Sequence, residues 1–222
     1  MDHTFKATGE ELKAMGAEVA AMGDLAVSQV RAALDALVRG DAAAAAVVAA
    51  EDARLDEMEA AIERQTVRFI ALRQPMADDL RRPIAAMKIA AQLERCGDLA
   101  KNLAKRMAKL DALPSPEQLA EVARLGALAA GRLEMALDAY RRRDATTTVR
   151  VWAGDAEVDA LHERVFQSIA AEMADDPTKL AICTHLLFIA KNLERLGDHA
   201  TNIAELAHFE IAGERLGDRL RG

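Results

Sequence analysis

The chain has 222 residues, 51% of them hydrophobic but only 3% aromatic, and its formal net charge is −7. This composition favours closely packed helices over sheets, which prefer β-branched and aromatic side chains. The negative charge argues against binding to nucleic acid, which needs a basic face. No apolar run approaches the roughly 18 residues of a membrane span, and the amino terminus does not resemble a signal peptide. We therefore expect an all-α cytosolic protein that does not insert into membranes.

Three helices are predicted in the first half of the chain. Apolar residues recur at helical spacing over 10–38 and again over 42–71. Between these segments, Gly40 suits the end of a helix and Asp41 can cap the next one. Pro75 ends the second helix, and Asp78 or Asp79 is expected to cap a third helix that reaches about residue 110.

The best domain boundary in the chain lies at 111–118. Ser115, Pro116 and Gln118 have the spacing of a helix start with a capping box. Helices are then expected over 116–142, 144–173 and 176–210, the last two opened by aspartates. The sequence thus predicts a first bundle at 1–112, a second at 113–210, and a frayed tail at 211–222.

The two halves are copies of each other. The motif at 94–98, Glu-Arg-Cys-Gly-Asp, returns at 194–198 as Glu-Arg-Leu-Gly-Asp. Earlier helices match at an offset of 103 residues and the third helices at 100, because the loop around Pro75 is three residues longer than its counterpart. A period of about 100 residues is too long for a solenoid, so it indicates two tandem three-helix bundles that arose by duplication.

Acidic pairs spaced four residues apart occur twice in each half. This spacing places both carboxylates on one helix face, where they destabilise the helix slightly, so their repetition needs a cause. A divalent cation held between neighbouring helices would supply one. Helical projection puts the pairs about a quarter turn from the apolar face, in a groove partly open to solvent. The candidate ligands are Asp52, Asp56, Glu94, Asp98, Asp155, Asp159, Glu194 and Asp198, with Glu59, Asn102, His162, Asn202 and Glu205 as weaker candidates.

A solvated acidic face is the alternative interpretation. For a single pair it is the simpler one, but the recurrence of four pairs at matching places favours a site. Gly97 and Gly197 interrupt the same helices, and a glycine inside a helix costs about 1 kcal/mol relative to alanine, which indicates close helix packing. If the face is only solvated, its ion-pair partners are expected to be Arg95, Lys101, Lys191 and Arg195.

Cys96 and Cys183 fit no metal-binding or redox spacing, so both are expected to be reduced and structural. The arginine clusters at 81–82 and 141–143 lie near predicted helix ends, where cations suit the helix dipole. They are expected to be solvated, with an anion or partner site as the alternative.

These motifs resemble those of the PhoU family. The resemblance covers nearly the whole chain and rests on the segments 72–81, 93–102 and 192–205. It implies two tandem three-helix bundles, a homodimer, and clusters of iron or zinc, or of other divalent cations, on the four acidic pairs. It also implies a cytoplasmic negative regulator of phosphate uptake and of the phosphate-starvation response. Its partners would be the ATPase subunit of the phosphate ABC transporter and the phosphate sensor histidine kinase.

Two departures distinguish the halves. Lys105 stands where the second half has Glu205, and Glu59 stands where it has His162, so the second site is expected to be richer in ligands. A di-iron oxidase would need two Glu-x-x-His motifs facing a bundle core. The chain has one, ending at His208, and no counterpart in the first half, so we expect no enzymatic activity. A metal-free helical adaptor is the remaining alternative.

Overall fold

The computed structural model describes residues 2–51, 53–110 and 114–216. Within these ranges the chain is helical and contains no strand, which confirms the predicted all-α fold. The helices are α1 (Asp2–Arg39), α2 (Ala42–Ala50), α3 (Ala53–Arg73), α4 (Asp78–Met107), α5 (Pro116–Arg142), α6 (Ala145–Ala153), α7 (Asp155–Asp175), the 3₁₀ turn η1 (Pro177–Lys179) and α8 (Leu180–Ala212).

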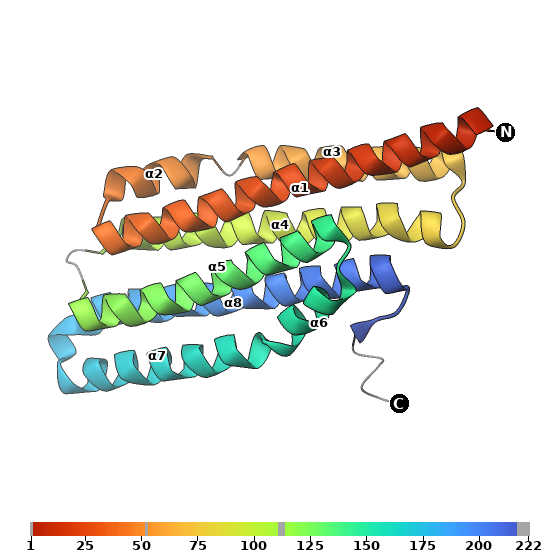
Figure 1. Ribbon diagram of the computed structural model, residues 1–222. Coiled ribbons are helices and arrows are strands. Elements are labelled where there is room, and N and C mark those ends of the chain that lie inside the picture. Colours follow the sequence, from red (N-terminus) through yellow and green to blue (C-terminus); the bar gives the residue numbers. More distant parts are fainter. Residues whose placement is uncertain (1, 52, 111–113, 217–222) are drawn as a thin grey trace.

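Four long helices, α1, α4, α5 and α8, lie side by side along the molecule (Figure 1). The two repeats meet where α1 contacts α5 and α4 contacts α8, while α2 with α3 and α6 with α7 lie on the outer sides. The buried apolar residues of both repeats form one continuous core. Among the helices described, none has the length and apolar character needed to cross a membrane.

Two predicted helices are each broken in the structure. The expected helix over 42–71 is divided into α2 and α3 near Glu51, and the one over 144–173 is divided into α6 and α7 at Gly154. At the first break, Gln29 Nε2 donates to the Glu51 carbonyl at 3.1 Å. At the second, a Cβ on Gly154 would lie 2.0 Å from the guanidinium of Arg132. The prediction of unbroken helices was wrong, and at each break a residue from a distant helix packs against the chain.

The aspartate caps were mostly predicted correctly. The Asp41 carboxylate accepts from the Ala44 amide, and Asp144 accepts from the amides of Thr146 and Thr147. The predicted cap at Asp78 or Asp79 was wrong, since α4 is preceded by Ala77, which makes no side-chain capping bond and has a φ of 48°. A positive φ is uncommon outside glycine, so the segment before α4 is strained.

The capping box at Ser115 is present, and removing it should destabilise the protein. Ser115 Oγ accepts from the Gln118 amide at 3.2 Å, and Gln118 Oε1 accepts from the Ser115 amide at 3.4 Å. We expect Ser115→Ala to lower the free energy of unfolding by about 1 kcal/mol, because the Gln118 amide loses its partner. Urea denaturation would measure this, with the exposed mid-helix substitution Ser168→Ala as the control. Equal effects of the two changes would contradict the prediction.

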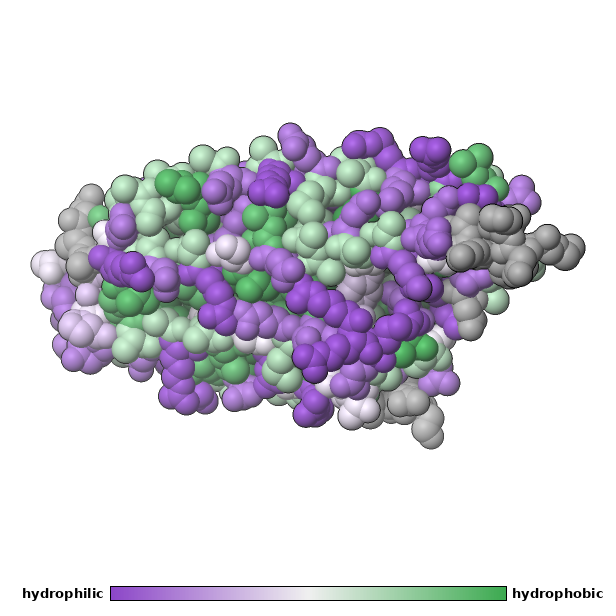
Figure 2. Space-filling view, turned by 45° about the horizontal axis from the view of Figure 1, so that its top comes forward, coloured by the Kyte–Doolittle hydropathy of each residue, from purple (hydrophilic) through white to green (hydrophobic). Residues whose placement is uncertain are grey.

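The contact between α1 and α5 is reciprocal. The Leu34 side chain packs on Gly126, where an added Cβ would lie 2.3 Å from Leu34 Cδ2, and Leu137 packs on Gly23 at 2.7 Å in the same way. Between these two contacts, Arg31 forms an ion pair with Glu134 at 2.5 Å. Hydrophilic residues form a broad band across the middle of this face of the molecule (Figure 2). Each glycine thus lets a helix of one repeat approach the other closely.

A buried carboxylate joins three helices at the other end of the core. Glu210 of α8 is 7% exposed and forms ion pairs with Arg143, which follows α5, at 2.5 Å and with Arg82 of α4 at 3.6 Å. Burial raises the pKa of Glu210, and the two arginines oppose that shift. Arg143, which is exposed as the sequence predicted, and the partly buried Arg82 therefore also serve as ion-pair partners of a buried acid, which the sequence did not predict.

The segment 211–222, expected to be frayed, continues α8 to Ala212. Gly213 ends the helix with a φ of 77°, and Leu216 is buried. Residues 217–222 lie outside the described part of the chain. Both cysteines are buried and free, as predicted.

Candidate metal centre

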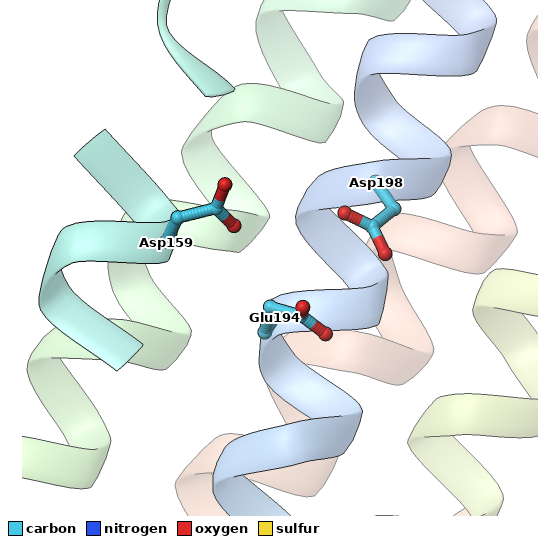
Figure 3. Close-up of side chains that lie close together, drawn as sticks. All are labelled: Asp159, Glu194 and Asp198. Carbon is cyan, nitrogen blue, oxygen red and sulfur yellow. The ribbon is translucent and has the colours of Figure 1, made fainter. Parts of the chain in front are cut away.

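Three carboxylates from two helices converge between α7 and α8. Asp159 extends from α7 toward α8, where Glu194 and Asp198 lie one turn apart on the facing side (Figure 3). One oxygen from each residue lies within 4.8 Å of the others. Oxygens that share a cation the size of Ca²⁺ lie at most about 5 Å apart, so this α7–α8 cluster could bind one divalent ion with little rearrangement.

Close contact between α7 and α8 depends on Gly197. A Cβ at this position would lie 2.9 Å from Val158 Cγ1, one residue before Asp159. The glycine within the motif therefore lets the helix carrying Glu194 and Asp198 approach the helix carrying Asp159. This explains why the motif contains a helix-destabilising residue, as the sequence predicted.

Among the described residues, one basic side chain, Lys191, pairs with the three acidic groups. Glu194 Oε1 accepts from Lys191 Nζ at 2.7 Å, while the buried Glu194 Oε2 has no hydrogen-bond partner among the described residues. Desolvation, followed by the nearby charge of Glu194, raises the pKa of Asp198, and Asp155 and Asp159 add to the shift. A buried carboxylate oxygen without a donor is costly, and a cation would satisfy it.

Two further candidates lie on the same face of α7. Asp155 accepts a hydrogen bond from Thr201 Oγ1 of α8 at 2.9 Å, so it lies one turn beyond the cluster. His162 lies one turn in the opposite direction along α7, and its buried Nε2 has no hydrogen-bond partner among the described residues. A nitrogen ligand would suit iron or zinc better than calcium or magnesium.

The corresponding carboxylates of the first repeat, Asp56, Glu94 and Asp98, are named the α3–α4 cluster; they do not bring one oxygen each within 4.8 Å of the others, and they have more basic partners. Arg95 pairs with Glu94 at 3.1 Å and with Asp98 at 3.2 Å, and Lys101 lies 3.8 Å from Asp98. In the second repeat, Arg195 makes no such pair within the described chain. Asp52, the remaining candidate of this repeat, lies outside the described residues.

The first repeat also has a close helix contact at a glycine and a carboxyl group whose pKa is raised by its neighbours. A Cβ on Gly97 would lie 2.3 Å from Leu55 Cδ1, so α3 and α4 also approach at a glycine. Desolvation and the charge of Asp98 raise the pKa of Glu94 to about 7, against the opposing effect of Arg95; Glu59 and Asp56 add smaller increases.

The raised pKa of Glu94 makes stability depend on pH. Its pKa rises from 4.5 to about 7 on folding, so between these pH values the folded state binds more protons than the unfolded state. Stability therefore falls as the pH rises through this window. Urea denaturation with chelator at pH 5 and pH 8 should show wild type losing more stability than Glu94→Gln, whereas the exposed Glu63→Gln should behave like wild type. A pH dependence unchanged in Glu94→Gln would refute this assignment.

Several sequence candidates lie away from the clusters. Asn202 Nδ2 donates to Gln92 Oε1 of α4 at 3.2 Å, Glu205 lines a cavity between α4 and α8, and Asn102 is exposed. His208 is buried, with its Nδ1 at 2.8 Å from Thr148 Oγ1. The Glu205 and His208 side chains therefore do not converge on one site, whereas a di-iron centre would require them to do so.

Thr201 is the one cluster neighbour that the candidate ligands omit. It follows Asp198 by three residues and so lies on the same side of the helix, but a threonine at that position does not by itself indicate a hydrogen bond to an aspartate of another helix. The first repeat has Lys101 at the corresponding position.

Known proteins resemble the chain over nearly its whole length. A family model described as the PhoU domain matches twice, at 19–107 and 122–207. A Caulobacter vibrioides protein named "Phosphate-specific transport system accessory protein PhoU homolog" is 50% identical over 97% of this chain and 94% of its own. A Zymomonas mobilis protein of the same name is 40% identical over 99% of this chain and 93% of its own.

Two crystal structures have the same fold. PhoU from Pseudomonas aeruginosa superposes with a TM-score of 0.89 at 34% identity, over 93% of this chain and 99% of that one. The phosphate transport system regulatory protein PhoU from Streptococcus pneumoniae superposes with a TM-score of 0.87 at 27% identity, over 94% of this chain and 99% of that one.

Proposed function

The chain belongs to the PhoU family, and from this premise we propose that it is a metal-binding regulator of phosphate transport. The names of its relatives, an accessory protein of phosphate-specific transport and a phosphate transport regulatory protein, support the role in transport. They describe accessory and regulatory proteins, in agreement with the expectation that the chain is not an enzyme.

The observation that carries the metal-binding part is the α7–α8 cluster. Its residues fit a divalent cation because one oxygen from each lies within 4.8 Å of the others and a buried oxygen of Glu194 has no donor in the described part of the chain. Asp159, Glu194 and Asp198 would hold the ion, with Asp155 and His162 as adjacent ligands. The bound cation would neutralise the charge between the two helices and fix their separation.

Iron or zinc is the metal we propose, as the family resemblance implies, with other divalent cations as alternatives. The α3–α4 cluster would bind more weakly, because Arg95 must leave both Glu94 and Asp98 before a cation can take its place. The second repeat would then determine the metal content of the protein at low metal concentration.

The regulatory part of the proposal concerns protein contacts. In the cytoplasm, the protein would act as a homodimer on the ATPase subunit of the phosphate ABC transporter and on the phosphate sensor histidine kinase. When phosphate is plentiful, it would restrain uptake and silence the starvation response. The family resemblance supports these partners.

A complementation experiment tests the regulatory use of the metal site. In cells lacking their own copy, wild type should silence a phosphate-starvation reporter at high phosphate. A variant with Asp159→Asn, Glu194→Gln and Asp198→Asn should leave it active. Equal protein levels and helical circular dichroism would exclude misfolding. Full silencing by the variant would instead favour a metal-free helical adaptor.

A further inference from the structure

A cavity of about 630 Å³ opens between the first half of α4 and the last half of α8. Its volume lies in the range that accommodates bound ligands or inserted side chains. Asn202 and Glu205 are the only metal candidates that line it, and neither belongs to the carboxylate clusters. Its apolar lining consists of Ala77, Leu80, Ile84, Ala91, Leu206 and Phe209.

The charge of this α4–α8 groove is opposite to that of the protein. Arg81, Lys88 and Arg215 line it together with a single acid, Glu205, although the chain carries a net charge of −7. Lys88 and Arg215 are exposed and form no ion pair with any residue that the structure describes. The groove therefore suits an occupant that is both apolar and anionic.

At the corresponding place in the other repeat, the chain's own side chains stack on each other. The positions matching Lys88 and Leu206 are Phe188 and Arg106, at an offset of 100. The Arg106 guanidinium lies over the Phe188 ring, 3.8 Å from its centroid. In the groove the matching pair is Lys88 and Leu206, neither of which has a ring, so this cation–π stack has no counterpart there and Lys88 can meet a group of another molecule.

A strained loop adjoins the groove. Gln74 and Ala77 both have positive φ, 46° and 48°, a conformation that residues other than glycine adopt only when the surrounding fold imposes it. Between them, Met76 is 82% exposed, and Leu72 is 67% exposed. Met76 in the loop and Leu72 in the last turn of α3 thus present large apolar side chains to solvent beside the groove residue Ala77. Methionine is common on surfaces that bind helices, because its side chain adapts its shape.

We propose that the α4–α8 groove docks an amphipathic helix of a partner protein whose apolar face is flanked by aspartates or glutamates. The α4 residues of the groove, from Leu80 to Gln92, extend over three turns, or about 18 Å, which matches the i, i+4, i+7 anchors of a helix bound in a groove. The acids would pair with Lys88 and Arg215. This site is independent of metal binding.

A helical peptide library would test the groove directly. The probe is a phage-displayed set of 18-residue peptides with apolar residues at four helical anchor positions and random flanks, selected on the purified wild-type protein. We expect the binders to be enriched in Asp and Glu, and synthetic copies to bind in fluorescence polarisation. Their affinity should fall at least tenfold for Lys88→Glu with Arg215→Glu, and also for Ala91→Trp, which fills the groove.

The control variant, Lys13→Glu with Arg124→Glu, changes the net charge equally with exposed cations of other helices and should stay within twofold of wild type. Circular dichroism would establish that all variants are folded. The proposal is overturned if no peptide binds, if basic peptides are selected, or if both double variants lose affinity equally. Decanoate binding without peptide binding would also overturn it, since the groove would then take a small amphiphilic anion.

Discussion

Wild-type protein purified without chelator should contain iron or zinc, and a variant with Asp159→Asn, Glu194→Gln and Asp198→Asn should lose most of it. The substitutions keep the shape of each side chain and remove three charged ligands. Loss of groups that only support metal ligands lowers affinity about 10–100-fold, so loss of the ligands themselves should exceed that range. Elemental analysis and titration with metal would measure the loss.

The matched control is the same change in the first repeat, Asp56→Asn, Glu94→Gln and Asp98→Asn. Because Arg95 already pairs with Glu94 and Asp98 of that cluster, we expect this variant to keep most of the metal. Thermal unfolding supplies a second readout: added metal should raise the melting temperature of wild type and of this control, but not that of the α7–α8 variant. Equal metal loss in the two variants would contradict the predicted difference between the repeats. If wild type contained no metal after loading, the acidic residues would form only a solvated face and not a metal site.

Replacing both Gly23 and Gly126 by alanine should have the largest effect on stability. Each added methyl would lie within 3 Å of a leucine from the other repeat, at 2.7 Å from Leu137 and at 2.3 Å from Leu34. Overpacking of a core costs about 1–3 kcal/mol per site. The two contacts lie about 16 Å apart along α1, so their effects should add to about 2–6 kcal/mol before the gain in helix propensity of about 1 kcal/mol per alanine, which leaves a net loss of up to about 4 kcal/mol. Urea denaturation would measure this loss.

Gly131 provides the control for this substitution. It lies inside α5, and nothing lies within 4 Å of an added Cβ, so Gly131→Ala should stabilise the protein by about 1 kcal/mol. Combining Gly126→Ala with Leu34→Ala should cost less than the sum of the single changes, because the second substitution removes the clash. Strict additivity of that pair would show that the two residues do not press on each other.

The sequence predicted the all-α fold and the repeat because both depend on local signals. Apolar periodicity, the aspartate caps and the repeated motif each extend over a few turns of one helix. The breaks at Glu51 and Gly154 were not predicted, because Gln29 and Arg132, which lie against them, belong to distant helices. The aspartates after these breaks, Asp52 and Asp155, are a helix-start signal that could have indicated them.

The candidate site was predicted in part for the same reason. Four-residue spacing correctly placed Glu194 and Asp198 on one face, and projection placed that face beside the core. Spacing could not reveal which neighbouring helix faces the polar side of each helix. Asn202 was therefore grouped with the metal ligands, although it contacts Gln92 of the other repeat. The α4–α8 groove likewise depends on how two distant helices are rotated about their axes.

The ion pair between Arg31 and Glu134 bears on how the two repeats came to share one chain. The two residues occupy the same position in their repeats, so they lie on the axis that relates the halves. In a symmetric dimer of identical half-length ancestors, this position would place two like charges against each other. Once the gene had duplicated and fused, one copy could become arginine and the other glutamate. An attraction at this position is thus open to a chain whose two repeats differ in sequence, and closed to two identical copies facing each other in the same way.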